Sequence, residues 1–378
     1  MNKKISEYVK ENSDFFTAVR HHLHENPELS CKEYETHKYI ASFLNSWQIP
    51  YEKAGETSIV ATIRGKTGKK TIAIRGDIDA LPIQEKTGLP WQSKSEGVMH
   101  ACGHDVHTTF MLGVAKILNE VREQLTGNVK IIFQEGEEIG AGAKKIMDEK
   151  LLHGVDTIIA LHDTQELDLG VFSLGYETMS SYGSGGSFLI DTEGKNNAII
   201  VAGELVSAVT AIANQRFSKS EQIVLVPTMI KTEGFSEKMA SRVRVVYNSR
   251  TLNLKNEKIM QKVLADAAKN IAPLFDCKIR LELRKVGNVV YNDRYFTNLA
   301  ADVIKTHFGS KSLIFTRPVM SGEDFSLYQK TIPGFFIHIG GAVNKEYRAL
   351  HTSKTCVDDK ILPIGIEFLL QYVFAYFS

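Results

Sequence analysis

The hydrophobic pattern predicts alternating strands and helices in the first half of the chain. Short apolar runs typical of buried strands occur near 57–63, 71–75, 129–133 and 157–161. Apolar residues at helical spacing occur over 5–25, over 32–47, from 104 onward and near 141–148. Apolar strands that alternate with helices favour an α/β fold with a mostly parallel sheet and helices on both faces.

The pattern changes after about Gly175 and returns from about Tyr291. Between them the chain predicts strands near 184–192, 222–231, 242–250 and 277–286, with helices over 203–215 and 256–272. This β-α-β-β-α-β order is that of a ferredoxin-like α+β domain. We therefore expect one domain built from residues 1–176 and 291–378, and an inserted domain over 177–290.

Composition and charge exclude several classes of protein. The 378 residues carry 45 basic and 44 acidic side chains, and no basic stripe interleaved with aromatics predicts a nucleic-acid partner. The apolar run 361–377 contains Pro363, Glu367 and Gln371 and is shorter than the ~20 residues of a membrane span, so we expect a core helix. The N-terminus lacks the apolar stretch of a secretory signal and the four cysteines lack a disulfide framework, which favours the cytoplasm.

The candidate chemistry begins in residues 99–107, MHACGHDVH. A thiol, three imidazoles and a carboxylate within nine residues are typical of a site for zinc or a similar metal, and Cys102 and His104 are the expected ligands. The cluster precedes a predicted helix, whose free amides we expect to help hold Cys102 as a thiolate. We expect His100 and His107 to be structural, hydrogen-bonded neighbours of the site and not ligands.

Three later segments offer the remaining ligands. Glu137 and Glu138 follow one predicted strand, His162 ends the next, and His351 lies in a polar loop. The carboxyl ends of parallel strands meet at one edge of a sheet. Of two adjacent carboxylates, one can bind metal while the other takes a proton from water. Asp77 or Asp79, after the strand near 71–75, could orient a ligand, and the sequence does not decide between them.

Six ordered motifs carry a resemblance to a known family. RGDIDALP, MHACGHDVH, FQEGEEIGAGAK, ALHD, MSGEDFSLY and LHTS resemble the aminoacylase and hippurate hydrolase group of dinuclear metallo-amidohydrolases, which includes N-acetyldiaminopimelate deacetylases and auxin-conjugate hydrolases. The resemblance implies a zinc exopeptidase-like fold, Glu137 as general base and Asp77 in the active site. It also implies two divalent ions (zinc, manganese, cobalt or nickel) held by Cys102, His104, Glu138, His162 and His351.

The same resemblance implies an activity and a partner. The expected reaction is hydrolysis of the amide bond of N-acyl, above all N-acetyl, amino acids by metal-activated water. A dipeptidase or carboxypeptidase with this mechanism is the alternative. The inserted domain is expected to act as a lid, and the chain is expected to form a homodimer through this domain. Glu323 and Asp324, which by themselves would indicate a helix N-terminus, would border the active site.

The inserted domain departs from the family pattern. Relatives commonly carry Gly-Gly-His where this chain has Asn196-Asn197-Ala198, and the segment before the helix predicted at Gly203 is shorter than usual. Loss of one oxyanion donor costs roughly a hundredfold to a thousandfold in turnover. His307, Arg216 or Tyr182 could substitute. A third reading is therefore a metal-binding homologue with impaired catalysis.

Overall fold

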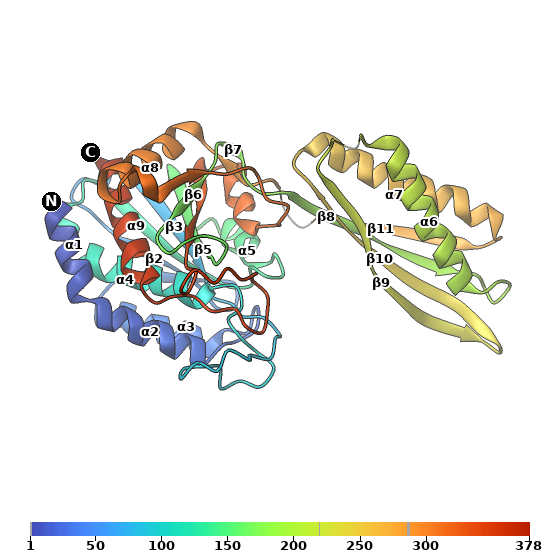
Figure 1. Cartoon of the computed structure of the whole chain (residues 1–378), viewed down its shortest axis with the longest axis horizontal. Helices are drawn as coiled ribbons and strands as arrows, with labels where there is room; N and C mark the ends of the chain where they lie inside the picture. Colours follow the sequence, from blue (N-terminus) through green and yellow to red (C-terminus); the bar gives the residue numbers. More distant parts are fainter. Residues whose placement is uncertain (1, 219, 286–287) are drawn as a thin grey trace. The chain divides into compact units, whose positions relative to one another are not determined.

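The chain folds into two compact units (Figure 1). The computed structural model describes residues 2–218, 220–285 and 288–378. The first unit comprises Met1–Met179, Tyr291–Arg317 and Asp324–Ser378, and the second comprises Ser180–Val290 and Pro318–Glu323. The short segment 318–323, which the sequence pattern assigned to the first domain, therefore lies with the second unit.

The first unit is built on an eight-stranded sheet with the order β1-β2-β4-β3-β5-β14-β6-β13. Strands β4, β3, β5 and β14 run parallel as neighbours, so their carboxyl ends meet at one edge. The predicted α/β fold with a mainly parallel sheet is confirmed. The strands are β1 (Tyr51–Ala54), β2 (Ser58–Ile63), β3 (Thr71–Asp77), β4 (Asn128–Gln134), β5 (Thr157–Thr164), β6 (Phe172–Leu174), β13 (Leu313–Phe315) and β14 (Gly334–Gly340), with a separate pair β7 (Glu177–Thr178) and β12 (Tyr291–Asn292).

Helices cover both faces of this sheet. Arg75 donates to Asp324 of η3, whereas the next residue, Gly76, lies against Met111 of α4. Successive strand residues point to opposite faces, so α4 and η3 lie on opposite sides. The helical elements are α1 (Asn2–Glu11), α2 (Ser13–Glu25), α3 (Tyr34–Ser46), α4 (His104–Glu120), η1 (Arg122–Gln124), α5 (Gly142–Asp148), α8 (Arg294–His307), η2 (Ser310–Ser312), η3 (Asp324–Lys330) and α9 (Ile361–Phe377).

Two expectations about helices have different outcomes. The single helix predicted over 5–25 is wrong, because it breaks between α1 and α2 at Asn12. There the Asn12 side chain donates to the carbonyl of Tyr8, and such local bonds compete with the helix. The run 361–377 does form a core helix, α9, with most of its length buried. Pro363 is tolerated in its first turn, where backbone N–H groups have no helical partner.

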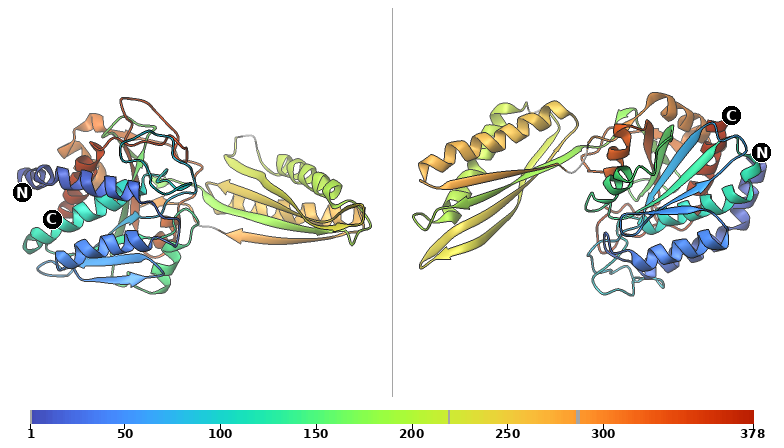
Figure 2. Two further views of the ribbon diagram at one scale, coloured as in Figure 1. Left: turned by 90° about the horizontal axis from the view of Figure 1, so that it is seen from below. Right: turned by 180° about the vertical axis from the view of Figure 1, so that it is seen from behind.

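The second unit is a four-stranded antiparallel sheet with two helices. The strand order β11-β8-β10-β9 and the chain order β8-α6-β9-β10-α7-β11 are those of a ferredoxin-like domain. Figure 2 shows α6 and α7 on the same face of this sheet. The elements are β8 (Tyr182–Asp191), α6 (Ala198–Arg216), β9 (Ile223–Ser236), β10 (Met239–Thr251), α7 (Leu254–Leu274) and β11 (Lys278–Lys285).

Helix α6 begins five residues earlier than predicted. Asn197 caps it by accepting a hydrogen bond from the N–H of Ile199, which starts the helix at Ala198 rather than near Gly203. By length and composition α6 could cross a membrane. Its side chains Val201, Leu205 and Val209 pack in the core of the second unit, although only 28% of the apolar stretch is buried.

Candidate metal centre

The predicted ligands meet at the carboxyl edge of the parallel strands. Cys102 precedes α4, His104 begins it, Glu138 follows β4 and His162 lies near the end of β5. His351 arrives from a loop between β14 and α9, which is fixed where its N–H donates to the carbonyl of Ala101 at 2.8 Å. Four separate chain segments therefore contribute to one cluster.

The ligand atoms of these five residues are close neighbours. His351 Nε2 lies 3.2 Å from Cys102 Sγ and 3.4 Å from Glu138 Oε1. His162 Nε2 lies 3.6 Å from the same sulfur, and His104 Nε2 lies 4.0 Å from Glu138 Oε1. Atoms that share a tetrahedral ion at its usual bond lengths lie about 3.3–3.8 Å apart. The spacing suits metal ligands.

Two buried atoms support this interpretation. Within residues 2–218, 220–285 and 288–378, His104 Nε2 and Glu138 Oε1 have no hydrogen-bond partner. A buried polar atom without a partner costs roughly 1–3 kcal/mol, which a bound cation would offset. Glu137 offers a carboxylate oxygen within 4.8 Å of these ligand atoms. The donor set of thiol, imidazole and carboxylate therefore fits divalent metal ions.

Asp79 orients two of the ligands. Its carboxylate accepts the backbone N–H groups of Glu137 and Glu138, each at 3.1 Å. His104 Nδ1 lies 2.8 Å from the Asp79 carbonyl oxygen and 3.2 Å from its Oδ1. The sequence did not decide whether Asp77 or Asp79 orients a ligand. In the structure it is Asp79 that contacts His104 Nδ1 directly.

Asp77 instead holds His107. His107 Nδ1 lies 2.5 Å from Asp77 Oδ1, and its Nε2 lies 3.0 Å from Asp163 Oδ1. Both ring nitrogens are thus occupied, in keeping with the structural role expected of His107. The closest approach of Asp77 to His104 is 3.6 Å, to its Nε2.

The Asp324 carboxylate is buried, and its partners include residues of β3 and β4. It accepts hydrogen bonds from Arg75 at 2.8 Å and from the Gln134 amide at 2.9 Å, so η3 is tied to the ends of β3 and β4. A local helix-terminus role does not account for these long-range contacts. His100 is also buried, and burial lowers its pKa to about 4, which keeps the ring neutral. The hydrogen-bonded role expected of His100 is wrong, because neither of its ring nitrogens has a hydrogen-bond partner among the described residues.

Burial shifts the pKa of two of the predicted ligands. It raises the pKa of the Cys102 thiol well above the usual range, although the neighbouring His104 acts to lower it. Burial likewise lowers the pKa of His162 well below its usual value. Burial opposes charge on His104, yet Asp77 raises the pKa of His104 well above its usual value. Metal ligation needs a thiolate and neutral imidazoles, so binding would release protons from Cys102 and His104, whereas His162 is already neutral.

Gly103 makes the turn between Cys102 and α4 possible. Its φ of +82° lies in the left-handed region, and a Cβ there would stand 1.7 Å from Asp163 Oδ1. Only glycine lets Cys102 and His104 approach the end of β5 this closely.

Among the described residues, the first turn of α6 carries no polar side chain in place of the histidine common in relatives. Ala198 is buried in the core of the second unit, and the exposed side chains of the first turn of α6 are Ile199 and Ile200. Of the candidates for substitution, Arg216 lies 3.7 Å from Asp266 and His307 ends α8. The side chain of Tyr182 lies outside the described residues.

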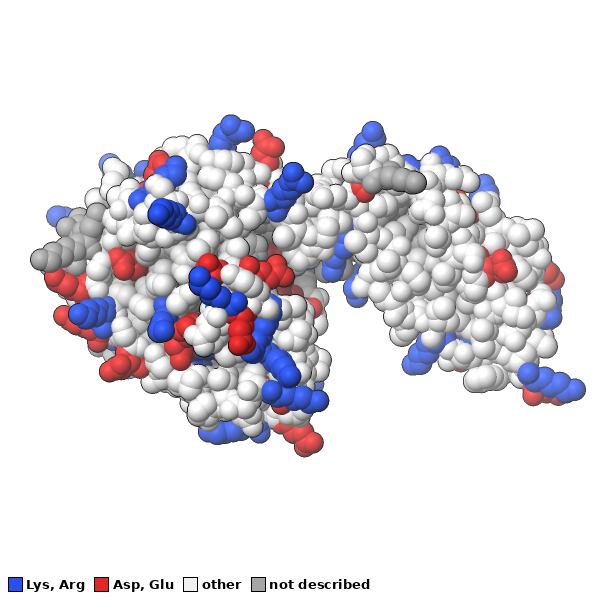
Figure 3. Space-filling view, viewed as in Figure 1, with Lys and Arg blue, Asp and Glu red and all other residues white. Residues whose placement is uncertain are grey.

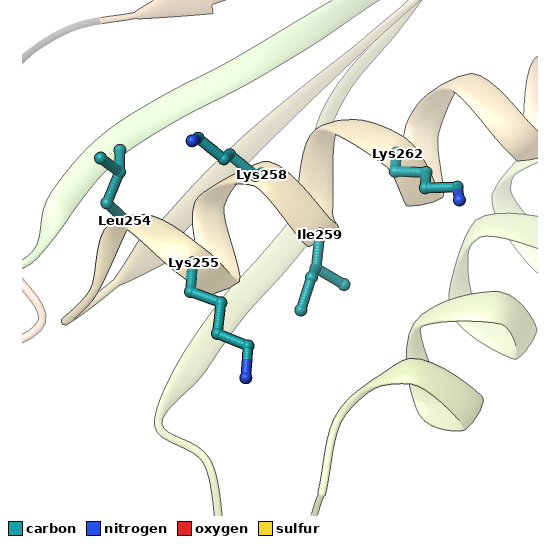
Figure 4. A pocket seen from close by; sticks show the side chains of 5 residues that line it. All are labelled: Leu254, Lys255, Lys258, Ile259 and Lys262. Carbon is teal, nitrogen blue, oxygen red and sulfur yellow. The ribbon is translucent and has the colours of Figure 1, made fainter.

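One surface hollow differs from this cluster in its chemistry. A hollow of about 470 Å³ on α7 is lined by Leu254, Ile259 and three lysines (Figure 4), and it offers no thiol, imidazole or carboxylate. On the face drawn in Figure 3, basic and acidic side chains are interspersed over the first unit. The metal-ligating chemistry therefore lies at the sheet edge and not in this hollow.

Comparison with known proteins agrees with this geometry. Residues 73–375 match the model of peptidase family M20/M25/M40. The chain is 32% identical to N-acetylcysteine deacetylase of Bacillus subtilis over 93% of its length and 94% of the relative, and 32% identical to N-acetyldiaminopimelate deacetylase of Lactobacillus acidophilus over 94% and 96%. The crystal structure of a Bacillus subtilis dinuclear metal binding peptidase of family M20 matches with a TM-score of 0.84 at 30% identity, covering 97% of this chain and 99% of that one. The resemblance drawn from the motifs is confirmed, and the chain belongs to peptidase family M20/M25/M40.

Proposed function

We propose that this hydrolase cleaves the amide bond of N-acyl amino acids, above all N-acetyl amino acids. The observation that carries the proposal is the cluster of five ligand atoms spaced 3.2–4.0 Å apart, with the Glu137 carboxylate beside it. The N-acetylcysteine and N-acetyldiaminopimelate deacetylases among its relatives support the substrate class.

In this proposal Cys102, His104, Glu138, His162 and His351 hold two divalent ions. The chemistry supplied by bound ions is a lowered water pKa and a polarised scissile carbonyl. Glu137 takes the proton of the attacking water and returns it to the leaving amine. Asp79 keeps the Glu137 and Glu138 backbone in place. Asp77 acts indirectly, by holding His107.

The test compares two neighbouring carboxylates. Metal content and hydrolysis of a panel of N-acyl amino acids and dipeptides are measured with zinc, manganese, cobalt or nickel added back. Glu137→Gln should abolish turnover and leave metal content near wild type, whereas Glu138→Gln should lower both. Glu123→Gln, at an exposed position outside the cluster, is the control. Turnover that survives Glu137→Gln would exclude Glu137 as the base.

A peptidase activity with the same mechanism is the second candidate. It is favoured by relatives named thermostable carboxypeptidase, at 28% identity over 96% of this chain. Preference for dipeptides over acetyl amino acids in the same panel would select it.

A metal-binding protein with impaired catalysis is the third candidate. Its support is the buried Ala198 and the apolar first turn of α6, where relatives commonly carry a histidine. Stoichiometric metal binding without turnover across the panel would select this reading.

We further propose a cytoplasmic homodimer in which the second unit serves as lid and dimerisation domain. All four cysteines are free, which suits a reducing compartment. The edge strand β9 exposes Val226, Met229, Ile230 and Phe235, and an uncovered apolar edge favours pairing. Sedimentation of the wild type and of Ile230→Lys tests the dimer; a monomeric wild type would exclude it.

A further inference from the structure

Two buried carboxyl groups, those of Glu33 and Glu135, both contact the hydroxyl of Thr57. Thr57 Oγ1 lies 2.5 Å from Glu33 Oε2 and 2.8 Å from Glu135 Oε2. A hydroxyl has one proton and can donate it to only one of these oxygens. The other contact needs a proton that belongs to a carboxyl group.

Glu135 is the ionised member of the pair. Its Oε1 accepts from the Lys145 ammonium at 2.5 Å, and its Oε2 accepts from the backbone N–H groups of Thr57 and Ser58. Although burial alone would raise the pKa of Glu135, these donors hold it below its usual value. The Thr57 hydroxyl therefore donates to Glu135.

Glu33 has the surroundings of a neutral acid. Its Oε1 accepts the backbone N–H groups of Cys31 at 2.8 Å and Gly136 at 2.9 Å, as a carbonyl oxygen would. Its Oε2 faces the Thr57 hydroxyl, whose own proton is already used. The charged groups that face it are Asp79 and Glu135, both acidic, while Lys145 is bound to Glu135. Burial raises the pKa of Glu33 to about 7.

The contact with Gly136 connects Glu33 to the candidate centre. Gly136 immediately precedes Glu137 and Glu138, and its φ of +60° turns the chain from β4 into this segment. A Cβ at Gly136 would stand 2.8 Å from Cys31 Sγ, so the turn is packed directly on the loop that carries Glu33. Asp79 holds the next two amides, and Glu33 holds the first.

We propose that Glu33 is a positioning residue that works as a protonated acid, donating to Thr57 and anchoring Gly136 at the start of the segment that carries Glu137 and Glu138. Glu33 touches no reacting atom. When it ionises at alkaline pH, two carboxylates oppose each other across one hydroxyl and the anchor weakens. The effect on turnover rests on the proposed hydrolysis and the effect on metal affinity rests on the proposed ligands, whereas the protonation of Glu33 rests on neither.

The first experiment reads the proton directly. Carbon-13 NMR of glutamate-labelled protein follows the carboxyl carbon of Glu33, assigned by its loss in Glu33→Gln, from pH 4 to pH 9. We expect a midpoint well above the ordinary value of about 4.3. A Glu33 that is already ionised at pH 6 would overturn the proposal, whatever the enzyme hydrolyses.

The second experiment compares three variants by manganese and zinc affinity across pH. The amide side chain of Glu33→Gln can accept both N–H groups and donate to Thr57, so the metal affinity of this variant should stay within about threefold of wild type at pH 6. Wild-type protein should lose metal affinity as Glu33 ionises at alkaline pH, and Glu33→Gln should not. Glu33→Ala should lose about tenfold to a hundredfold, the usual effect of removing a ligand-supporting contact. Glu35→Gln, an exposed change on the neighbouring helix α3, should match wild type.

The outcomes separate the two proposals. The proposal that Glu33 is a neutral acid would be excluded if Glu33→Gln bound metal as weakly as Glu33→Ala. It would also be excluded if Glu33→Gln lost metal affinity at alkaline pH as wild type does. Wild-type protein that binds metal and shows the raised Glu33 midpoint without hydrolysing any substrate would remove the proposed function and leave the positioning role standing.

Discussion

His104 Nδ1 lies 2.8 Å from the backbone carbonyl oxygen of Asp79 and 3.2 Å from its carboxylate. Because a carbonyl oxygen only accepts, a proton sits on Nδ1, which leaves Nε2 as the ring nitrogen that faces the cluster and could bind a metal. The same carboxylate accepts the amides of Glu137 and Glu138. One side chain thus aligns an imidazole and a pair of carboxylates.

Asp79→Asn should weaken metal binding about tenfold to a hundredfold. The asparagine amide has one oxygen, so its NH₂ group must face a backbone N–H that the aspartate accepted. Competition with a chromogenic chelator measures the change. Asp302→Asn, exposed on α8, should have no effect. Equal affinity in wild type and Asp79→Asn would show that the carboxylate does not orient the ligands.

Gly103→Ala and Gly88→Ala form a matched pair. Both glycines have positive φ, but a Cβ at Gly88 meets nothing within 4 Å of it, while a Cβ at Gly103 would overlap Asp163. Gly88→Ala should cost about 1–2 kcal/mol of unfolding free energy from backbone strain. Gly103→Ala should cost several kcal/mol more and reduce metal binding. Denaturant unfolding and metal titration check both, and similar losses in the two variants would contradict the overlap.

The stability of the first unit should depend on pH through His24. Its Nδ1 lies 2.8 Å from Asp105 and its Nε2 lies 3.3 Å from Glu85. Burial opposes the charge, yet the Asp105 and Glu85 carboxylates raise the pKa of His24 to about 9. Because the pKa of His24 is higher in the folded protein, its protonated imidazole stabilises the fold fully below about pH 6.5. This contribution is lost as the pH rises through 9.

The His24→Gln variant isolates this contribution. Its deficit in unfolding free energy against wild type should be about 3 kcal/mol at pH 6 and shrink towards pH 10. Denaturant unfolding at four pH values measures the difference. His153→Gln, at an exposed site, is the control. A deficit that is constant with pH would mean that His24 is neutral in the folded protein.

Chelation should lower the melting temperature of the first unit. A ligand that binds only the folded state at a hundred times its Kd adds about 2.7 kcal/mol. Melting curves with chelator and with zinc or manganese added back measure the shift. Cys102→Ala should abolish the gain, whereas Cys277→Ala in the second unit should keep it. Identical melting with and without metal would contradict a site formed by the fold.

The element order was predictable because apolar spacing records which faces are buried. The parallel strands, the β-α-β-β-α-β order of the second unit and the convergence of Cys102, His104, Glu138, His162 and His351 all follow from patterns and motifs. Helix limits were less predictable, because Asn12 and Asn197 act through local hydrogen bonds that interrupt or begin a helix. Such bonds leave apolar spacing unchanged.

The supporting residues could not be ranked from the sequence. Asp77 and Asp79 are two positions apart in one motif, and only the tertiary fold shows which imidazole each one meets. Asp163 follows His162 directly, which was a usable signal. Glu33 lies in no motif singled out from the sequence, and its role depends on partners more than twenty residues away in sequence, at Thr57 and Gly136.

The position of His351 has a consequence for how the protein is made. The other four proposed ligands precede the second unit in the chain, and His351 follows it. On the ribosome, the centre stays incomplete until the whole inserted domain has been synthesised. In the proposed centre a cation captured earlier would meet only four ligands, so full affinity would arise late in translation.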